Sequence, residues 1–129
     1  LPENVSWELL GPVAPDRVLE FYREHPVDLF LSTTSFEGRP VSIMEAMSCG
    51  IPVAATAVGG VPELVGPDRG WLLPMQPSPG DVAGLLASIA SRASLGAFRS
   101  SARRFWETHL RADRNFDDFA RMLRSMIAP

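Results

Sequence analysis

The sequence predicts an α/β fold with a parallel sheet and flanking helices. Three short apolar runs have the length of buried strands, at residues 27–32, 52–56 and 71–73. A segment with helical spacing of its apolar residues separates the first two runs. Glycine and proline stand at the junctions between these segments. Strands that alternate with helices are typical of parallel sheets, so the pattern indicates the α/β class.

The first quarter of the chain predicts a strand, a helix and a second strand. "VSWELL", residues 5–10, has strand character. Asp16 is a suitable N-cap for a helix over 17–25 that carries Val18, Leu19 and Tyr22 on one face, and Pro26 ends that helix. The apolar run at 27–32 then predicts a strand that is buried on both faces.

The next segment predicts a helix that begins at Pro40, because proline is well accommodated at the first helical position. Gly50 occupies the place of a C-terminal glycine cap. The strand at 52–56 follows. A turn-rich loop with one helical turn near residues 62–65 then leads to a short last strand at 71–73.

Residues 81–129 read as a helical region. Asp81 is the expected N-cap of a helix over 82–91, and two further helices are expected at 95–110 and 115–127. The last of these is amphipathic, because its apolar residues recur at helical spacing. Those residues are Phe116, Phe119, Ala120, Leu123, Met126 and Ile127.

Length and composition favour one globular domain over residues 1–129. The net charge of −3 leaves no basic footprint for nucleic acid. All twelve basic residues are arginine, which indicates a GC-rich, bacterial source. Cys49 is the only cysteine, so an intrachain disulfide and a cysteine-based metal site are excluded. No apolar run reaches the roughly 20 residues that cross a bilayer. We expect a cytoplasmic protein.

Two glutamates in "SFEGRPVSIMEAMSCG" suggest a ligand site. Glu37 lies in the loop "TTSFEGR", after the strand at 27–32, and Glu45 lies within the helix that follows. Ligands of open parallel sheets bind at the carboxyl ends of the strands, and the helix beginning at Pro40 directs free N–H groups there. A carboxylate accepts hydrogen bonds from hydroxyl pairs. A ligand whose phosphate is bound by helix N–H groups, and whose hydroxyls are bound by carboxylates on either side, is a nucleotide sugar. The residues alone leave open that both glutamates are simply solvated.

The stretch "EGRPVSIMEAMSCGIPVAATAVGGVPELV" resembles the sequence motif of family-4 retaining glycosyltransferases. That motif has two glutamates separated by seven residues, then A-x-x-x-G-x-P-V-x-A-T and G-G-x-x-E. The matching positions are Glu37, Gly38, Pro40, Glu45, Ala46, Gly50, Pro52, Val53, Ala55, Thr56, Gly59, Gly60 and Glu63. The resemblance implies the GT-B architecture of two Rossmann-like domains, with this chain as the later, partial C-terminal domain and its closing helices.

The resemblance implies a role for each glutamate. Glu45 is similar to the residue that accepts hydrogen bonds from the nucleotide ribose. Glu37 is similar to the residue that holds donor-sugar hydroxyls, and it is the catalytic candidate. A nucleophilic role for Glu37 remains open. A front-face route through the departing phosphate is preferred, because a residue that binds donor hydroxyls is badly placed for back-side attack.

The resemblance also implies which backbone segments lie near the donor. Gly38, Arg39 and Pro40 are similar to the stretch beside the sugar and diphosphate, although Arg39 departs from the aromatic or aliphatic residue common there. Gly59 and Gly60 are expected to let a second loop pass close to the site. The chain has no D-x-D element, so no metal and no cofactor other than the donor substrate is expected.

The family order of strands, 3-2-1-4-5-6, makes residues 5–10 strand 3 and residues 27–32 strand 4. Strands 1 and 2 would be missing, so the two segments should be non-adjacent, or paired directly in a rearranged sheet. The missing N-terminal half, or another copy of the chain, is the expected partner. The isolated chain should not catalyse transfer. A peripheral position at the inner face of the membrane stays open.

Other functions remain as alternatives. One is a sugar-nucleotide epimerase or a sugar phosphorylase on a related GT-B scaffold, which would form product without an acceptor or with inorganic phosphate. The other is a non-catalytic module that only binds a nucleotide or another protein. Retention of both Glu37 and Glu45 favours the transferase, with a glycan, polysaccharide or glycolipid as the product.

Overall fold

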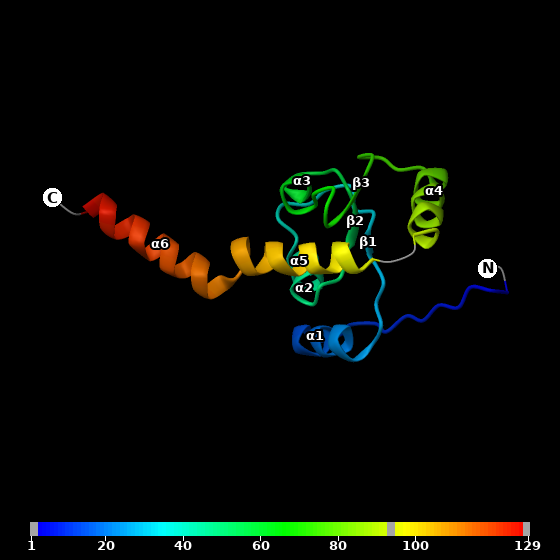
Figure 1. Cartoon of the computed structure of the whole chain (residues 1–129), viewed down its shortest axis with the longest axis horizontal. Helices are drawn as coiled ribbons and strands as arrows, with labels where there is room; N and C mark the ends of the chain where they lie inside the picture. The colour runs from blue at the N-terminus through cyan, green and yellow to red at the C-terminus, as the bar shows by residue number, and fades with distance from the viewer. Residues whose placement is uncertain (1–2, 93–94, 128–129) are drawn as a thin grey trace.

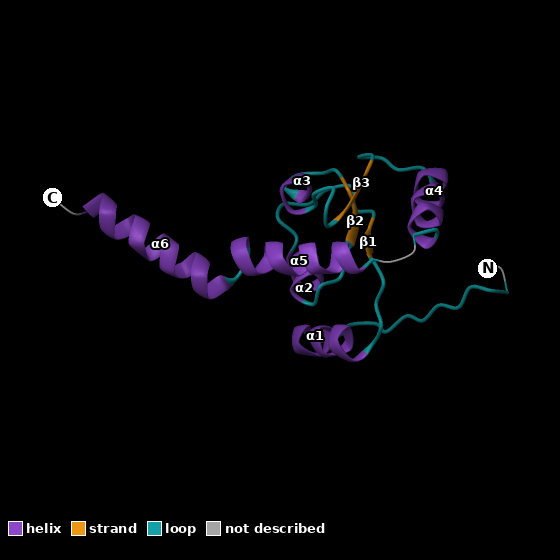
Figure 2. Ribbon diagram, in the orientation of Figure 1, coloured by secondary structure: helices purple, strands orange, loops and turns teal. Residues whose placement is uncertain are grey.

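A computed structural model of the chain describes residues 3–92 and 95–127. Its centre is a three-stranded parallel sheet in the order β1-β2-β3. The strands are β1 (Phe30–Ser32), β2 (Val53–Thr56) and β3 (Gly70–Leu73). The predicted α/β class with a parallel sheet is therefore confirmed, and Figure 2 shows the strands side by side among the helices.

The register aligns the three strands at their starts. Phe30 lies opposite Val53, and Val53 lies opposite Gly70. Gly70 is required there, because a β-carbon would stand 2.2 Å from the carbonyl oxygen of Val53. The carboxyl ends of β1 and β2 therefore reach the same edge of the sheet, and the loops that follow them begin as neighbours.

The helices flank this sheet. Their bounds are α1 (Pro15–Glu24), α2 (Val41–Ser48), α3 (Val61–Leu64), α4 (Pro79–Ala90), α5 (Gly96–His109) and α6 (Ala112–Ile127). In Figure 1, α5 runs beside α2 across the body, while α6 continues outward from it and α4 stands at the opposite end.

The core lies between the sheet and the α2–α5 pair. Its buried residues are Ile43, Ala46, Met47, Ile51, Val53, Ala55, Val58, Val61, Leu64, Val65, Ala102 and Leu110. Most of them belong to the segment between Val41 and Leu73. The apolar residues of α2 recur at helical spacing, so one of its faces meets the strands. This core fixes the positions of the two loops at the sheet edge.

Two predicted N-caps differ from the structure, and α6 begins at Ala112, before the predicted start at 115. Pro15 begins α1, with Ala14 as the N-cap, so Asp16 lies in the first turn. Ser78 is the N-cap of α4: its hydroxyl accepts from the N–H of Asp81, whose carboxylate accepts from the N–H of Ser78 at 2.8 Å. Asp81 is thus the far member of a capping box. The prolines after Ala14 and Ser78 fit the first helical position and place each cap one residue before it.

The predicted strand at residues 5–10 is wrong. The segment has no regular structure, and the side chains of Trp7 and Leu9 are 70% and 83% exposed. A strand exists only where a neighbouring strand pairs its N–H and C=O groups. Since 5–10 forms no strand, neither expected arrangement with 27–32 occurs. β1 itself is shorter than predicted, starting where the Phe30 N–H bonds the Pro52 carbonyl at 3.0 Å.

Candidate functional site

The loop that follows β1 is fixed from the end of β2. Thr56, the last residue of β2, is buried, and its hydroxyl donates a hydrogen bond to the carbonyl of Thr34. The backbone of residues 33–39 is thereby held over the carboxyl end of the sheet. The bond gives the buried Thr56 hydroxyl its hydrogen-bond partner. It also orders the loop in advance, which lowers the conformational entropy that ligand binding would otherwise cost.

The two glycines after β2 form a close junction with the same loop. Gly59 has φ of +51°, and a β-carbon on it would stand 1.7 Å from the carbonyl oxygen of Glu37. The N–H of Gly60 donates to the carbonyl of Gly38 at 2.8 Å. A β-carbon on Gly60 would also stand 2.6 Å from that carbonyl oxygen. Both positions therefore require glycine, for close approach of backbone to backbone.

Helix α2 starts directly after this junction. Pro40, its N-cap, is buried and lies one residue before the first helical residue, which the prediction had placed at Pro40 itself. Pro40 offers no side-chain cap. The first-turn N–H groups, from Val41 to Ile43, are thus left for another acceptor, as at helix N-termini that bind anions. At the other end, Gly50 has φ of +69°, and the predicted glycine cap is confirmed.

The two glutamates occupy the elements that the sequence indicated. Glu37 is half-buried in the loop after β1, and Glu45 is half-buried in α2. Burial, followed by the charges of Glu45 and then Cys49, raises the pKa of Tyr22 in α1. Glu45 therefore lies within electrostatic reach of α1. Whether the two carboxylates share one crevice stays a prediction.

The other site candidates are placed as follows. Arg39 is exposed beside the glycine junction, where its backbone packs close to Gly60. Cys49 is a half-buried free thiol at the C-cap of α2. Within residues 3–92 and 95–127, no three His, Cys, Asp or Glu side chains gather as a metal site would need. No helix in those ranges is both long and apolar enough to span a bilayer.

Sequence reasoning missed two residues at this site. Thr56 appeared only as a motif position, although it fastens the Glu37 loop through Thr34. A threonine at the end of an otherwise apolar strand is the signal that could have found it. Tyr22 in α1 is the second, and no sequence signal pointed to it, because its relation to Glu45 depends on packing between helices that are distant in sequence.

Comparison with known proteins now assigns the family. The model of the family described as "Glycosyl transferases group 1" matches residues 2–104, which is well over half of the chain. The chain belongs to this family. Its motif region, from Glu37 to Glu63, lies inside the match, whereas α6 lies beyond it.

Individual relatives agree with this assignment. The amylovoran biosynthesis glycosyltransferase AmsK of Erwinia amylovora is 36% identical over 94 residues, 69% of this chain and 22% of that protein. The D-inositol 3-phosphate glycosyltransferase of Acidothermus cellulolyticus is 33% identical over 101 residues, 74% of this chain and 22% of that protein. Among solved structures, sucrose-phosphate synthase from Thermosynechococcus elongatus superposes with a TM-score of 0.69 at 25% identity. That match covers 77% of this chain and 25% of the synthase chain. The chain thus spans about a quarter or less of each of these proteins.

Proposed function

We propose that these residues form the later part of the donor-binding domain of a family-4 retaining glycosyltransferase with GT-B architecture. The enzyme moves a sugar from a nucleoside diphosphate to an acceptor hydroxyl during glycan, polysaccharide or glycolipid synthesis. The observation that carries the proposal is the glycine junction. Gly59 and Gly60 hold the Glu37 loop against the uncapped start of α2, where an anion is favoured.

Each part of the donor meets a matching group in this proposal. The diphosphate accepts hydrogen bonds from the first-turn N–H groups of α2, and the backbone from Gly38 to Pro40 lines its path. Glu37 accepts hydrogen bonds from the sugar hydroxyls. Glu45 accepts them from the ribose. Carboxylates suit both roles, because an ionised carboxylate only accepts hydrogen bonds.

The chemistry is that of leaving-group stabilisation. The bond between the anomeric carbon and the diphosphate oxygen breaks, and the diphosphate gains negative charge as it departs. Backbone N–H groups that point at this charge stabilise the transition state more than the ground state. Transfer then proceeds on the front face, the departing phosphate accepting the acceptor's proton. In this proposal no metal or cofactor is required. The dipole of α2 and basic side chains, such as Arg39, balance the charge of the diphosphate.

The proposal places the acceptor site outside these residues. Relatives of this chain are more than three times its length, and the remaining part of such a polypeptide would supply the opposite wall of the cleft. The 129 residues alone should bind nucleotide weakly and should not transfer sugar. A cytoplasmic enzyme, with or without peripheral contact to the inner face of the membrane, fits this reading.

The test is a pair of substitutions in the full-length polypeptide that carries these residues. Glu45→Gln keeps the shape and removes the charge. Charge-assisted hydrogen bonds contribute about 1.5–3 kcal/mol, so donor affinity measured by calorimetry should fall roughly ten- to a hundredfold. Glu37→Ala should lower turnover more than the affinity for free nucleoside diphosphate, because Glu37 touches the sugar.

The matched control is Glu107→Gln, the same change on the exposed face of α5, where Glu107 pairs with Arg103 at 2.7 Å. It should leave donor affinity unchanged. Donor binding that is equally unaffected by Glu45→Gln would refute the ribose assignment. A glycosyl adduct trapped on Glu37 would replace the front-face route by a covalent one.

A further inference from the structure

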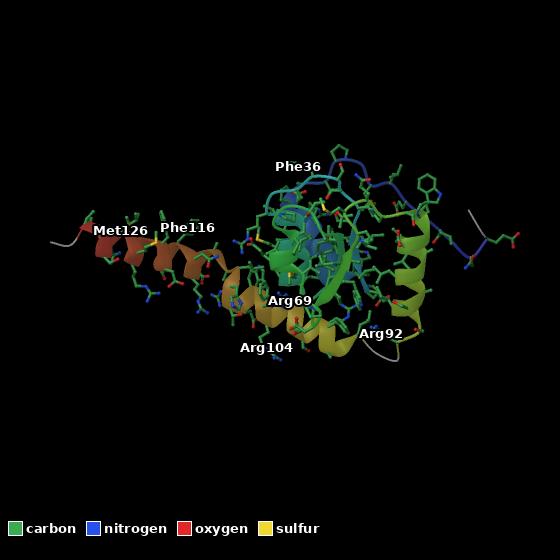
Figure 3. All side chains as sticks on the ribbon, turned by 90° about the horizontal axis from the view of Figure 1, so that it is seen from above. Phe36, Arg69, Arg92, Arg104, Phe116 and Met126 are labelled. Carbon is green, nitrogen blue, oxygen red and sulfur yellow. The ribbon has the colours of Figure 1, made fainter. Side chains whose placement is uncertain are left out.

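The carboxylate of Glu37 has no anchor of its own. Within residues 3–92 and 95–127 it makes no hydrogen bond and no ion pair. The neighbouring Phe36, labelled in Figure 3, lies at the outer rim of the body and is 88% exposed, so packing does not hold the loop there either. The position of the Glu37 carboxylate therefore depends on the backbone of its loop.

Two carbonyls of this loop are held from the end of β2 and the residues that follow it. The hydroxyl of Thr56 donates to the carbonyl of Thr34, three residues before Glu37. The N–H of Gly60 donates to the carbonyl of Gly38, one residue after Glu37, at 2.8 Å. Glu37 is thus fastened on both sides, once by a side chain and once by backbone. The bond from Thr56 is the one that a change of side chain can remove.

The register of the sheet explains why a side chain acts at this point. β1 pairs with β2 up to Ser32, which lies opposite Ala55. The chain then leaves the sheet, so Thr56 has no residue of β1 opposite it. On its other side Thr56 lies opposite Leu73 in β3. Its hydroxyl reaches Thr34 where the ladder of backbone hydrogen bonds between β1 and β2 has ended.

The core has no need of this hydroxyl. Thr56 is 1% exposed, and a hydroxyl buried without a partner destabilises a fold. Valine has nearly the same shape and would fill the position without a polar group, as Val53, Ala54 and Ala55 do in the rest of β2. What the hydroxyl adds is one directional bond to the Glu37 loop. That bond orders the loop.

We propose that Thr56 is a positioning residue for the donor sugar. Its hydroxyl fixes the loop that carries Glu37, and thereby sets how strongly Glu37 holds the sugar hydroxyls. The inference rests on the proposed function, which makes Glu37 the sugar-binding residue. Glu45 and the first-turn N–H groups belong to α2, whose own backbone hydrogen bonds hold them. Loss of the Thr56 hydroxyl should therefore weaken the sugar part of the site and spare the ribose and diphosphate parts.

Calorimetry on the full-length polypeptide tests this separation. The probes are a nucleotide sugar, chosen by thermal shift from a panel of UDP-, GDP- and ADP-sugars, and the matching nucleoside diphosphate. Thr56→Val should weaken binding of the nucleotide sugar roughly three- to tenfold, which is the size of one net hydrogen bond. Affinity for the nucleoside diphosphate should change less than about twofold. Thr56→Ser keeps the hydroxyl and should restore binding of the nucleotide sugar.

Thr108→Val is the matched control. The Thr108 hydroxyl also donates to a backbone carbonyl, that of Arg104 at 2.8 Å, but within α5. Its loss should leave both affinities unchanged. Equal weakening by Thr56→Val and Thr56→Ser would show that the methyl group matters and the hydroxyl does not, and would overturn the proposal.

Two further measurements separate positioning from general support of the fold. In a Glu37→Ala background, Thr56→Val should cause no further loss of nucleotide-sugar affinity, because the hydroxyl acts through Glu37. The Gly60 amide, bonded to Gly38 across the junction, should exchange its hydrogen roughly three- to tenfold faster in Thr56→Val. An undiminished loss in the Glu37→Ala background, or unchanged exchange at Gly60, would overturn the proposal.

Failure of this inference is distinguishable from failure of the proposed function. If Glu37→Ala lowers nucleotide-sugar affinity and turnover while Thr56→Val changes neither affinity, only the role of Thr56 is overturned. If Glu37→Ala itself leaves both quantities unchanged, the sugar-binding role of Glu37 is refuted, and the role of Thr56 is refuted with it.

Discussion

Apolar side chains of the same type are buried in the segment from Val41 to Leu73 and exposed at the two ends of the chain. Met47 in α2 is completely buried, whereas Met126 in α6 is 73% exposed. Leu64 is completely buried, and Leu9 is among the most exposed leucines described. Residue type therefore does not decide burial here. What decides it is whether the chain supplies a partner for the face on which the residue lies.

This difference in burial shows which segments have their apolar faces covered by other described residues. α2, β2, α3 and β3 follow one another in sequence and supply most of the core, and α5 packs against α2 from a distant part of the chain. Residues 5–10 and α6 instead carry large apolar side chains that are mostly exposed within the described residues. The edge of β1 opposite β2 is likewise without a strand in the part of the chain that the structure describes. Unpaired strand edges and exposed apolar faces of this kind are surfaces that proteins usually cover.

The largest expected effect lies at the glycine junction. Gly59→Ala would place a β-carbon 1.7 Å from the carbonyl oxygen of Glu37, at a φ of +51°. The left-handed backbone alone costs a non-glycine residue about 1–2 kcal/mol, and the overlap forces two backbones apart. We expect a loss of about 4 kcal/mol or more, measured by chemical denaturation of the 129-residue chain.

Gly38→Ala is the matched control for this change. Gly38 lies across the same junction, but a β-carbon on it would meet no atom within 4 Å, and its φ is not positive. Its free energy of unfolding should stay within about 0.5 kcal/mol of the unchanged chain. Equal losses at both glycines would mean that the junction is not closed in solution.

The next effect compares two methionines. Met47→Ala should lower the free energy of unfolding of the 129-residue chain by about 3 kcal/mol, because it leaves a cavity in the core. Met126→Ala should change it by less than about 0.5 kcal/mol, since the side chain is mostly in water. If Met126→Ala were as costly as Met47→Ala, α6 would be packed in solution and the contrast drawn above would fail.

The sequence predicted best those features that adjacent residues determine. Gly50 ends α2 because its own φ of +69° suits glycine, and the Glu37 loop follows β1 because Gly38 and Pro40 interrupt the chain there. The strand at 5–10 failed because a strand depends on a remote partner. The cap of α4 was placed three residues late, because Ser78 and Asp81 are both acceptable capping residues and Pro79 decides between them.

The smallest effect concerns a link between the core and α5. Asp68, in the loop between α3 and β3, accepts a hydrogen bond from the hydroxyl of Ser101 in α5. This bond is the main cause that holds the pKa of Asp68 below its ordinary value of 3.8. A carboxyl whose pKa is lower in the folded state stabilises the fold at pH values above its unfolded pKa. That stabilisation is lost as the pH falls through the folded pKa.

Ser101→Ala should therefore lower the free energy of unfolding near neutral pH by about 0.5–1 kcal/mol, below the usual range for a hydrogen bond to a charged group, because the Asp68 side chain is 57% exposed. The difference from the unchanged chain should shrink once the pH drops below 3.8. Ser88→Ala is the control, because the Ser88 hydroxyl donates only to the carbonyl of Leu85. Its difference should not depend on pH. A Ser101→Ala difference that is equally flat from neutral to acid pH would show that the hydrogen bond from Ser101 to Asp68 does not stabilise the fold in solution.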